Sequence, residues 1–449
     1  MINAEYVLFA GIGLTILADL FRKELRIDRG RLIHAMTLSI LVIAFGAGLI
    51  YGNMNVQFYN ETQYSQFINS FVLFLSILIY SFILIDGDET LNTHLDILFM
   101  LAVLGAMLVV LSSNLLSLAV AVEMLSVASY GIIYFQKSDR HLEAAVKYLM
   151  TSIVSMAILL FGISLVYAGS GTLSFSSLST VNFFPFVAGI VFVVAGLAFK
   201  STLVPFHMWA PDVYEASDSA VTAFLSSISK TAGLVALIRI FFFAVPVSHI
   251  ISMLFLGIAL VTIFFAAVLA TVQDRIKRIL AYSSISQAGF AFIGLGLLTA
   301  SGVFSSVFYI FSFAIADALV FLAYKIFEDN KIIYRKDAYR MGAVSKVALV
   351  GLFLGILSLA GFPPTVGFFG KLLIFESIFS SGYLYVVVLL FFILLFSTFY
   401  YFGLLADTNP VSSIMGRKNA VAHKSRRNSM KEAIVVVLIL SLFVGIIFA

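Results

Sequence analysis

Three lysines and one glutamate lie deep within hydrophobic runs that are long enough to cross a bilayer. The lysines are Lys200, Lys230 and Lys371, and the glutamate is Glu123 in the run LSLAVAVEMLSVASYGIIYF. An ionisable side chain in hydrocarbon is costly, so such residues usually face an internal polar path and mark the movement of ions or protons. We therefore place these four residues at the centre of a predicted proton path.

Lysine and glutamate suit proton exchange because their protonation responds to their surroundings. A nearby carboxylate favours the charged form of a lysine, whereas desolvation disfavours it. A lysine that alternates between these two situations takes up and releases a proton, which an arginine cannot do. The alternative interpretation is structural: Glu123 or Lys230 in an ion pair that fixes helix packing, and Lys200 extending to the membrane interface.

Two further ionisable residues extend this set. His207 follows Lys200 by seven residues, and it either continues the relay or only hydrogen-bonds a helix end. Asp317 is central in SVFYIFSFAIADALVFLAYK, and Lys325 is the nearest basic residue along that run. Burial could keep Asp317 protonated, or its carboxyl could hydrogen-bond a neighbouring helix. Asp317 is therefore a further candidate for the path.

Composition sets the class of the protein. The 449 residues are 61% hydrophobic and 11% charged, whereas soluble domains carry about 25% charge, so we predict a polytopic membrane protein. The first segment follows MINAE without a basic n-region, and we expect a retained helix there and not a signal peptide. The absence of cysteine excludes thiolate-bound clusters and disulfides. No nucleotide-binding or metal-ligand pattern is present, so we expect neither a cofactor nor a metal in this chain.

About 20 apolar residues are needed to span a bilayer. On that length the sequence predicts an all-α fold of fourteen transmembrane helices, near residues 2–21, 32–51, 67–85, 94–112, 114–135, 146–168, 184–208, 219–243, 247–271, 280–300, 303–327, 345–380, 382–406 and 431–448. The run 345–380 is too long for one straight helix. Gly361, Phe362, Pro363 and Pro364 lie at its middle and predict a broken helix, since proline removes a backbone donor.

The basic residues predict the orientation. Short cytoplasmic loops collect Lys and Arg, and all but four of the 27 basic residues fall in the odd-numbered loops of this arrangement. The exceptions are Lys200, Lys230, Arg239 and Lys371, which all lie within predicted spans. Both termini are therefore expected outside the cell.

The helix pattern also predicts an internal repeat. Predicted helices 4–8 and 9–13 form two five-helix blocks of opposite orientation, and the fourth helix of each block contains prolines near a buried lysine. Inverted repeats with matching broken helices are typical of ion-translocating proteins. We divide the chain into a three-helix segment (1–93), two repeats (94–243 and 247–406) and a cytoplasmic loop with the last helix (407–449).

Three motifs resemble one protein family. They are FKSTLVPFHMWAPDVYEASDSAVTAFLSSISK, VQDRIKRILAYSSISQAGF and LSLAGFPPTVGFFGK, and they resemble the antiporter-like membrane subunits of respiratory complex I, within them the N-type subunit. Where the family usually continues YEGAP, this chain has YEASD, and Asp218 or Ser219 could cap the following helix. By position, the resemblance implies a proton relay that runs through Glu123, Lys147, Lys200, His207, Lys230 and Lys371.

The resemblance further implies a proton-translocating subunit of a prokaryotic NADH:quinone oxidoreductase in the inner membrane, without a redox centre of its own. NADH, FMN, iron–sulfur clusters and quinone are then expected in partner subunits, and other membrane-arm subunits and the lipid bilayer are the expected partners, with no nucleic acid. Three alternatives remain: an Mrp-type cation/proton antiporter subunit, a homologue from a membrane-bound hydrogenase or a deazaflavin-coenzyme dehydrogenase, and a structural anchor whose charges only hold the arm together.

Overall fold

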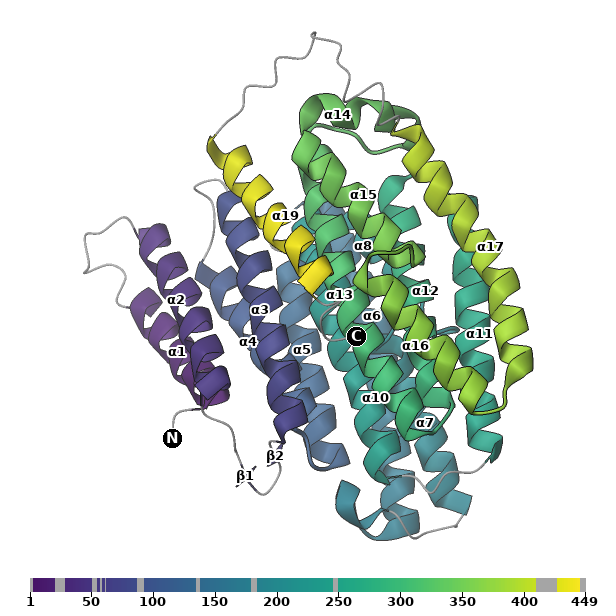
Figure 1. The fold of residues 1–449 in the computed structure, drawn as a ribbon. Helices are drawn as coiled ribbons and strands as arrows, with labels where there is room; N and C mark the ends of the chain where they lie inside the picture. The colour runs from purple at the N-terminus through teal and green to yellow at the C-terminus, as the bar shows by residue number, and fades with distance from the viewer. Residues whose placement is uncertain are drawn as a thin grey trace. The chain divides into compact units, whose positions relative to one another are not determined.

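Helices make up nearly all of the regular structure (Figure 1). The computed structural model describes residues 3–20, 29–50, 55–56, 59–60, 62–86, 93–134, 138–178, 184–244, 249–408 and 426–444. In these ranges two short strands, β1 (Asn55–Val56) and β2 (Tyr59–Asn60), pair with each other, and the other elements are helical. The predicted all-α class is confirmed. Ten of the described helices are long and apolar enough to cross a membrane, so the count of fourteen and the inverted repeats stay predictions.

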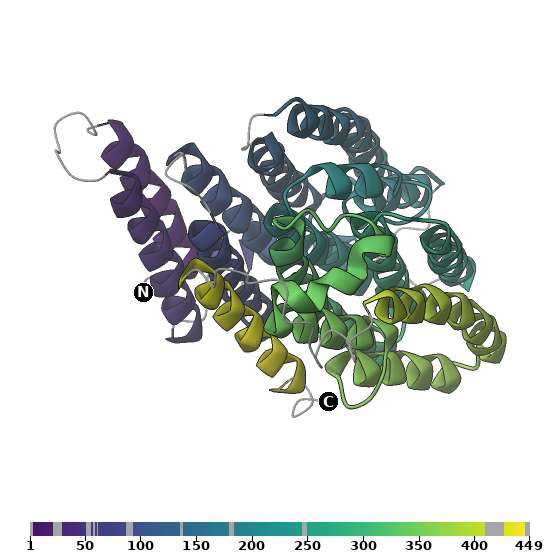
Figure 2. The same cartoon turned by 90° about the horizontal axis from the view of Figure 1, so that it is seen from above.

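The chain divides into two compact units. The first unit comprises Met1–Lys200 and Val235–Pro246. Its helices are α1 (Ala4–Leu20), α2 (Arg29–Ile50), α3 (Gln63–Asp86), α4 (Thr93–Leu111), α5 (Leu115–Tyr134), α6 (Asp139–Ser170), the short η2 (Phe175–Ser177) and α7 (Phe184–Lys200). α4 packs on α5 and α6 packs on α7. Figure 2 shows this unit from above, with α1 and α2 side by side.

Glycines allow the close approach of α6 and α7 in the first unit. A methyl group added at Gly162 would lie 2.6 Å from the backbone nitrogen of Val193, and one at Gly189 would lie 2.6 Å from that of Val166. Any side chain at these positions would force the helices apart, because the neighbouring atoms belong to the backbone. The contact therefore fixes α7, whose last residue is Lys200, against α6.

α6 begins earlier than the sequence pattern predicts. It starts at Asp139 instead of near residue 146, and the Ser138 side chain caps it by accepting a hydrogen bond from the His141 nitrogen at 3.3 Å. The N-cap and the acidic first residue both favour a helix start there. Lys147, which the pattern places at a helix entrance, consequently lies within α6.

The second unit comprises Ser201–Leu234 and Val247–Ala449. Its helices are α8 (Trp209–Ala216), α9 (Ser219–Phe224), η3 (Leu225–Ser229), the start of α10 (Lys230–Ala244), α11 (His249–Thr271), α12 (Ile276–Gly296), α13 (Ala300–Glu328), η4 (Arg335–Arg340), α14 (Met341–Val344), α15 (Lys346–Ala360), α16 (Val366–Ser380), α17 (Leu384–Asp407) and α19 (Arg426–Val444). α13 is its central helix, in contact with α9, α12, α15, α16 and α19. Residues 409–425, most of the loop predicted between the spans 382–406 and 431–448, lie outside the described residues.

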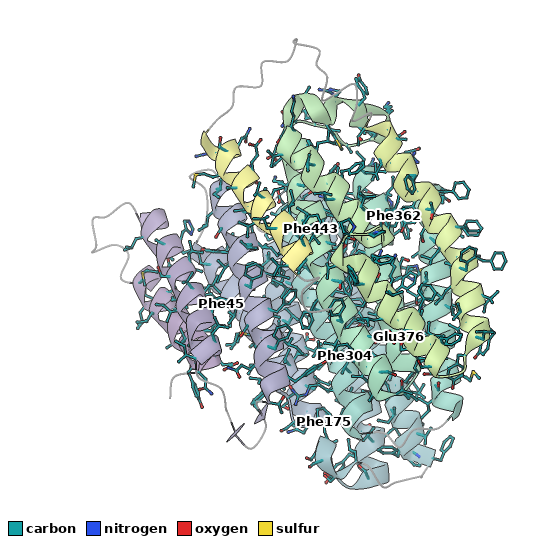
Figure 3. All side chains as sticks on the ribbon, in the orientation of Figure 1. Phe45, Phe175, Phe304, Phe362, Glu376 and Phe443 are labelled. Atoms are coloured by element: carbon teal, nitrogen blue, oxygen red, sulfur yellow. The ribbon has the colours of Figure 1, made fainter. Side chains whose placement is uncertain are left out.

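Two breaks interrupt the helices where prolines predict them. α7 ends at Lys200, and a series of turns that includes Pro205 leads to α8 at Trp209. α15 ends at Ala360 with Gly361 in the left-handed conformation (φ 85°), a common helix terminator, and α16 starts after Pro363 and Pro364. Figure 3 labels Phe362 at this second break. Lys200, which the sequence places within a span of residues 184–208, is thus the last residue of its helix.

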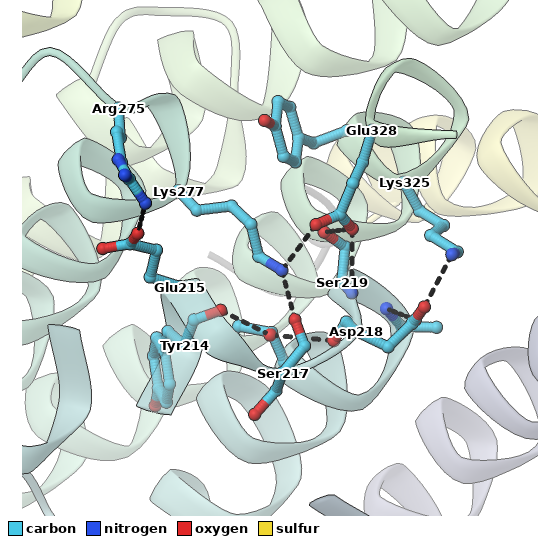
Figure 4. A network of polar contacts seen from close by, with 12 residues as sticks. Tyr214, Glu215, Ser217, Asp218, Ser219, Arg275, Lys277, Lys325 and Glu328 are labelled. Carbon is cyan, nitrogen blue, oxygen red and sulfur yellow. Dashed lines mark hydrogen bonds and ion pairs between the residues drawn. The ribbon is translucent and has the colours of Figure 1, made fainter. Parts of the chain in front are cut away.

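Ion pairs hold the short helix α8 in the second unit (Figure 4). Arg275 pairs with Glu215. Arg278 Nη1 lies 2.9 Å from both Glu215 Oε2 and Asp212 Oδ1. Arg275 and Arg278 come from the start of α12, so these pairs connect α8 to α12. Each exposed pair adds only about 0.2–1 kcal/mol, but the shared carboxylate of Glu215 makes them a network.

A second set of polar contacts holds the start of α9 (Figure 4). Asp218, one of the two candidate caps, caps α9 by accepting a hydrogen bond from the Ala220 nitrogen at 2.8 Å, and its Oδ2 lies 2.6 Å from Lys325 Nζ. Lys277 donates to the Ser217 carbonyl and lies 2.9 Å from Glu328 Oε1. The residues between α8 and α9 are thus tied to the start of α12 and the end of α13.

The pKa of Asp218 is lowered by these contacts. Burial raises the pKa of this carboxyl, but the charge and hydrogen bond of Lys325, the charge of Lys277 and the hydrogen bond from Ala220 outweigh burial. A carboxylate whose folded pKa lies below its unfolded value of about 4 stabilises the fold above that value and loses the contribution as the pH falls through the folded pKa.

Asp218→Asn keeps the cap and removes the charge. At neutral pH we expect it to lower the free energy of unfolding of the purified chain by about 1.5–3 kcal/mol, a range typical of hydrogen bonds to charged groups. The difference from the unaltered chain should shrink as the pH falls below about 4. The single tryptophan, Trp209 in α8, allows unfolding to be followed by its fluorescence. Lys336→Ala, an exposed change in η4, is the control, and an undiminished difference at low pH would contradict the assignment.

Candidate functional site

Lys200 lies among hydroxyl groups within the first unit. Its side chain is buried, and its ammonium donates to Ser126 Oγ at 3.1 Å and to Tyr148 Oη at 2.9 Å. Ser126 belongs to α5 and Tyr148 to α6, so three helices meet at this ammonium. Lys200 is also the C-terminal residue of α7, where the helix dipole favours a positive charge. The surroundings thus accommodate a cation in an otherwise apolar interior.

Glu123 acts on Lys200 through its charge. It is half-buried one turn before Ser126 on α5, and the two ionisable groups interact electrostatically. Ser126 does not carry a proton between them, because its hydroxyl donates to the Val122 carbonyl of its own helix at 2.8 Å. Glu123 and Lys200 therefore form an acid–base pair that is coupled through space.

Lys147 is not brought into this cluster. Its side chain is 48% exposed, and its ammonium lies 2.8 Å from Glu143 Oε1, one turn earlier on α6. The neighbouring residue Tyr148 faces Lys200 instead. The structure thus places Lys147 at a solvated or interfacial position, next in sequence to a residue of the buried cluster.

Lys230 and Asp317 are joined by a serine within the second unit. All three side chains are buried: Lys230 donates to Ser284 Oγ, and Ser284 donates to Asp317 Oδ2. Lys230 also lies 5.7 Å from the ring centroid of Tyr214, a cation–π distance. The sequence pattern named Lys325 as the nearest base to Asp317, but Lys325 pairs with Asp218 and with Asp329.

A π-helical turn immediately precedes Lys230. Residues Leu225–Ser229 form η3, in which the helix accommodates one extra residue per turn before α10 begins at Lys230. Such turns are rare and occur frequently at functional sites. The span Ser219–Phe241 that contains this turn is wholly buried. The irregular turn sets the direction in which Lys230 leaves the helix.

Lys371 contacts the end of the broken helix α15. Its ammonium donates to the carbonyls of Leu359 at 2.7 Å and Ala360 at 3.0 Å, and it lies 4.8 Å from the ring centroid of Phe290. The last carbonyls of a helix lack partners within the helix and carry its negative dipole end. Gly361 leaves room for the lysine, since a methyl group there would lie 2.7 Å from Lys371 Cδ. The break therefore supplies the acceptors that this ammonium needs.

A group of buried polar side chains continues from Lys371. The Leu359 carbonyl also accepts from Gln287 Nε2 at 3.1 Å, and the same amide donates to Tyr401 Oη at 2.7 Å. Tyr401 in turn shares a hydrogen bond of 2.5 Å with Ser283, the residue before Ser284 on α12. Hydrogen bonds therefore connect the Leu359 carbonyl, which contacts Lys371, to Ser283 on α12, and Ser283 is adjacent to Ser284, the partner of Lys230.

His207 lies in the turns between α7 and α8. It is buried, and its Nδ1 has no hydrogen-bond partner among the described residues. The contacts there do not distinguish a relay role from a structural one. In the same ranges no group of three His, Cys, Asp or Glu side chains could hold a metal ion.

Sequence reasoning missed two residues that bind the lysines. Tyr148 and Ser284 are the hydrogen-bond partners of Lys200 and Lys230, and neither was predicted. A signal for Ser284 was available: Ser283, Ser284 and Gln287 place three polar residues on one stretch of an apolar helix. Tyr148 offered no such signal, because tyrosines are common near the ends of membrane helices.

The sequence is similar to a family of membrane subunits. Residues 112–398 match the family model described as NADH:quinone oxidoreductase/Mrp antiporter, TM. The NADH-quinone oxidoreductase subunit N of Heliobacterium modesticaldum is 33% identical over 408 residues, which cover 88% of this chain and 85% of that protein. The subunit N of Moorella thermoacetica is 37% identical over 312 residues, covering 68% of this chain and 66% of that protein.

Solved structures share the fold. A chain of respiratory complex I from Thermus thermophilus with bound aureothin superposes with a TM-score of 0.84 at 24% identity, covering 99% of this chain and 97% of that chain. A chain of the Mrp complex from a Dietzia species gives a TM-score of 0.80 at 18% identity, covering 98% and 94%. From the family match and the curated relatives together, the chain belongs to the NADH:quinone oxidoreductase/Mrp antiporter family of membrane subunits.

Proposed function

We propose that the chain is the N-type, proton-translocating membrane subunit of a complex I-type NADH:quinone oxidoreductase. The observation that carries this proposal is the set of three buried lysines, each met by hydroxyls, helix-end carbonyls or a carboxylate. The relatives from Heliobacterium and Moorella, both named subunit N, support the choice of complex. Ionisable groups in a membrane interior are costly, and by default they indicate an ion or proton path.

The proposed relay runs through Glu123, Lys147, Lys200, His207, Lys230 and Lys371. The three buried lysines, Lys200, Lys230 and Lys371, are each held where acceptors favour the charged form and burial favours the neutral form, so a modest change in either moves a proton. Moving one charge across 100 mV needs about 2.3 kcal/mol, and a change of one pKa unit corresponds to about 1.4 kcal/mol. A change of about two units at one lysine would therefore match that step.

The free energy for pumping comes, in this proposal, from partner subunits. NADH, FMN, iron–sulfur clusters and quinone would be bound there, and this chain takes part in the enzyme as a translocating subunit. Its partners would be other membrane-arm subunits and the lipid bilayer. This division of labour agrees with a chain that contains no cysteine to ligate a cluster.

Removal of a relay member should stop pumping and leave assembly intact. We expect Lys230→Ala and Glu123→Ala to lower proton uptake by inverted membrane vesicles about 100-fold, since losing a positioned proton donor or acceptor typically costs that much or more. Uptake is normalised to the amount of assembled complex. Lys336→Ala and Glu376→Ala are the matched controls, because both residues are exposed. Normal uptake in Lys230→Ala and Glu123→Ala would favour a structural anchor.

An Mrp-type cation/proton antiporter subunit is the second candidate, because the family model covers both kinds of protein and the Dietzia chain shares the fold. The two are separated by reconstituting the purified chain alone into liposomes. We expect no sodium/proton exchange under an imposed sodium gradient, since the chain would need neighbours to drive it. Sustained exchange would support the antiporter. Empty liposomes give the background.

We further propose a prokaryotic inner-membrane location with both termini outside, on the distribution of basic residues. Because the chain has no cysteine, single cysteines can be labelled selectively. Ser176→Cys, in an exposed position after η2's first residue, should react with a membrane-impermeant reagent from outside, and Asn330→Cys after α13 from the cytoplasmic side. The reverse pattern at both sites would overturn the orientation. The unaltered chain is the blank.

A further inference from the structure

We propose that Asp317 exchanges a proton with Lys230 through the hydroxyl of Ser284. This inference rests on the proposed function and adds the carboxyl group of Asp317 to the relay residues of the second unit. It assigns Asp317 a direct part in proton transfer, where the sequence alone left its role open. The observation behind it is the uninterrupted contact from Lys230 to Ser284 to Asp317.

The directions of the hydrogen bonds are determined by chemistry. A lysine ammonium has only donors, an ionised carboxylate has only acceptors, and a serine hydroxyl has one proton and two lone pairs. Ser284 Oγ must therefore accept from Lys230 and donate its own proton to Asp317 Oδ2. Both hydrogen bonds are thus directed from the ammonium toward the carboxylate, which is the arrangement that a relay requires.

The transfer balances without another reactant. One N–H bond of the Lys230 ammonium breaks as its proton passes to Ser284 Oγ, and the Ser284 O–H bond breaks as that proton passes to Asp317 Oδ2. A neutral amine, a serine hydroxyl and a carboxylic acid result. One positive and one negative charge disappear together, so the net charge of the site is unchanged.

Burial and mutual attraction act in opposite directions on the ionised pair. Lys230 and Ser284 are fully buried and Asp317 is 1% exposed, so desolvation penalises the ion pair while mutual attraction favours it. Lys325, the other base near Asp317 in sequence, is held by Asp218 at 2.6 Å and by Asp329 at 2.8 Å. Lys230 is therefore the base that is connected to Asp317 by hydrogen bonds, through Ser284.

The first unit provides an internal contrast. There, Ser126 also accepts from a lysine, but its proton is directed to the Val122 carbonyl and not to Glu123. Ser126 consequently positions Lys200 and cannot pass its proton to the acid. The two lysine–serine contacts look alike in chemistry and differ in where the serine proton goes.

The second carboxyl oxygen of Asp317, Oδ1, could pass a proton on toward Lys371. Oδ1 has no hydrogen-bond partner among the described residues, although it is buried. Its charge interacts with Tyr309 and Tyr400, and Tyr309 donates to Gln287, the amide that contacts the Leu359 carbonyl beside Lys371. A proton held on Asp317 would thus lie on the side of the cluster that leads to Lys371.

The test uses the assembled complex in inverted membrane vesicles. Asp317→Asn keeps the shape and removes the titrating group, Asp317→Glu keeps a carboxyl, Ser284→Ala removes the hydroxyl, and Ser284→Thr keeps it. Ser312→Ala is the matched control, because Ser312 is equally buried on α13 and donates to the Phe308 carbonyl of its own helix at 2.8 Å. Proton uptake is normalised to assembled complex, and infrared difference spectra of the purified complex during turnover report protonation of a carboxyl group.

We expect Asp317→Asn to lower uptake about 100-fold and to remove a carboxylic-acid band from the difference spectrum. Ser284→Ala should weaken both signals, Asp317→Glu and Ser284→Thr should restore part of them, and Ser312→Ala should change neither. If Asp317→Asn prevents assembly, the comparison of Ser284→Ala with Ser284→Thr decides the matter.

Normal uptake and an unchanged spectrum in Asp317→Asn, with uptake lost in Lys230→Ala, would overturn the role of Asp317 and leave the proposed function standing. Equal loss in Ser284→Ala and Ser284→Thr would show a packing effect and would also overturn the relay. If Lys230→Ala and Glu123→Ala pump normally, the proposed function itself fails.

Discussion

A lysine ammonium in an apolar interior needs acceptors for its protons, and this need organises both units. Lys200 finds two hydroxyls from neighbouring helices, Lys230 finds a serine and an aromatic face, and Lys371 finds the carbonyls at a helix end. Each solution brings a different structural feature with it. The close contact of α6 with α7, the π-helical turn and the break after α15 are the features that make these acceptors available.

The break after α15 supplies partial negative charge from backbone carbonyls, without an ionisable side chain. A continuous helix would satisfy the Leu359 and Ala360 carbonyls internally, and Lys371 would then be buried without acceptors. Gly361 both ends the helix and leaves space for the lysine side chain. The proline pair after it prevents the helix from resuming at once. A backbone irregularity thus performs the task that a buried carboxylate would otherwise perform, at a lower desolvation cost.

The sequence predicted the elements better than the contacts between them. Long apolar runs, prolines and capping residues have local signatures, and the all-α class and both breaks were predicted correctly, with Asp218 one of two candidates for the cap. The earlier start of α6 was missed because its first turn is polar, although Ser138 could have indicated it. The pairing of Asp317 with Ser284 joins residues far apart in the chain, and helical periodicity within one run does not specify which neighbour lies opposite.

The π-helical turn before Lys230 has a geometric consequence for the helix that follows it. An α-helix advances about 100° per residue, and a turn with one extra residue therefore offsets all later side chains by about that angle relative to an unbroken helix. If Leu225–Ser229 tightened to α geometry, Lys230 would rotate off Ser284 and its proton would lose its acceptor. A shift of the backbone by one residue would then break the contact of Lys230 with Ser284 and interrupt the proposed proton path.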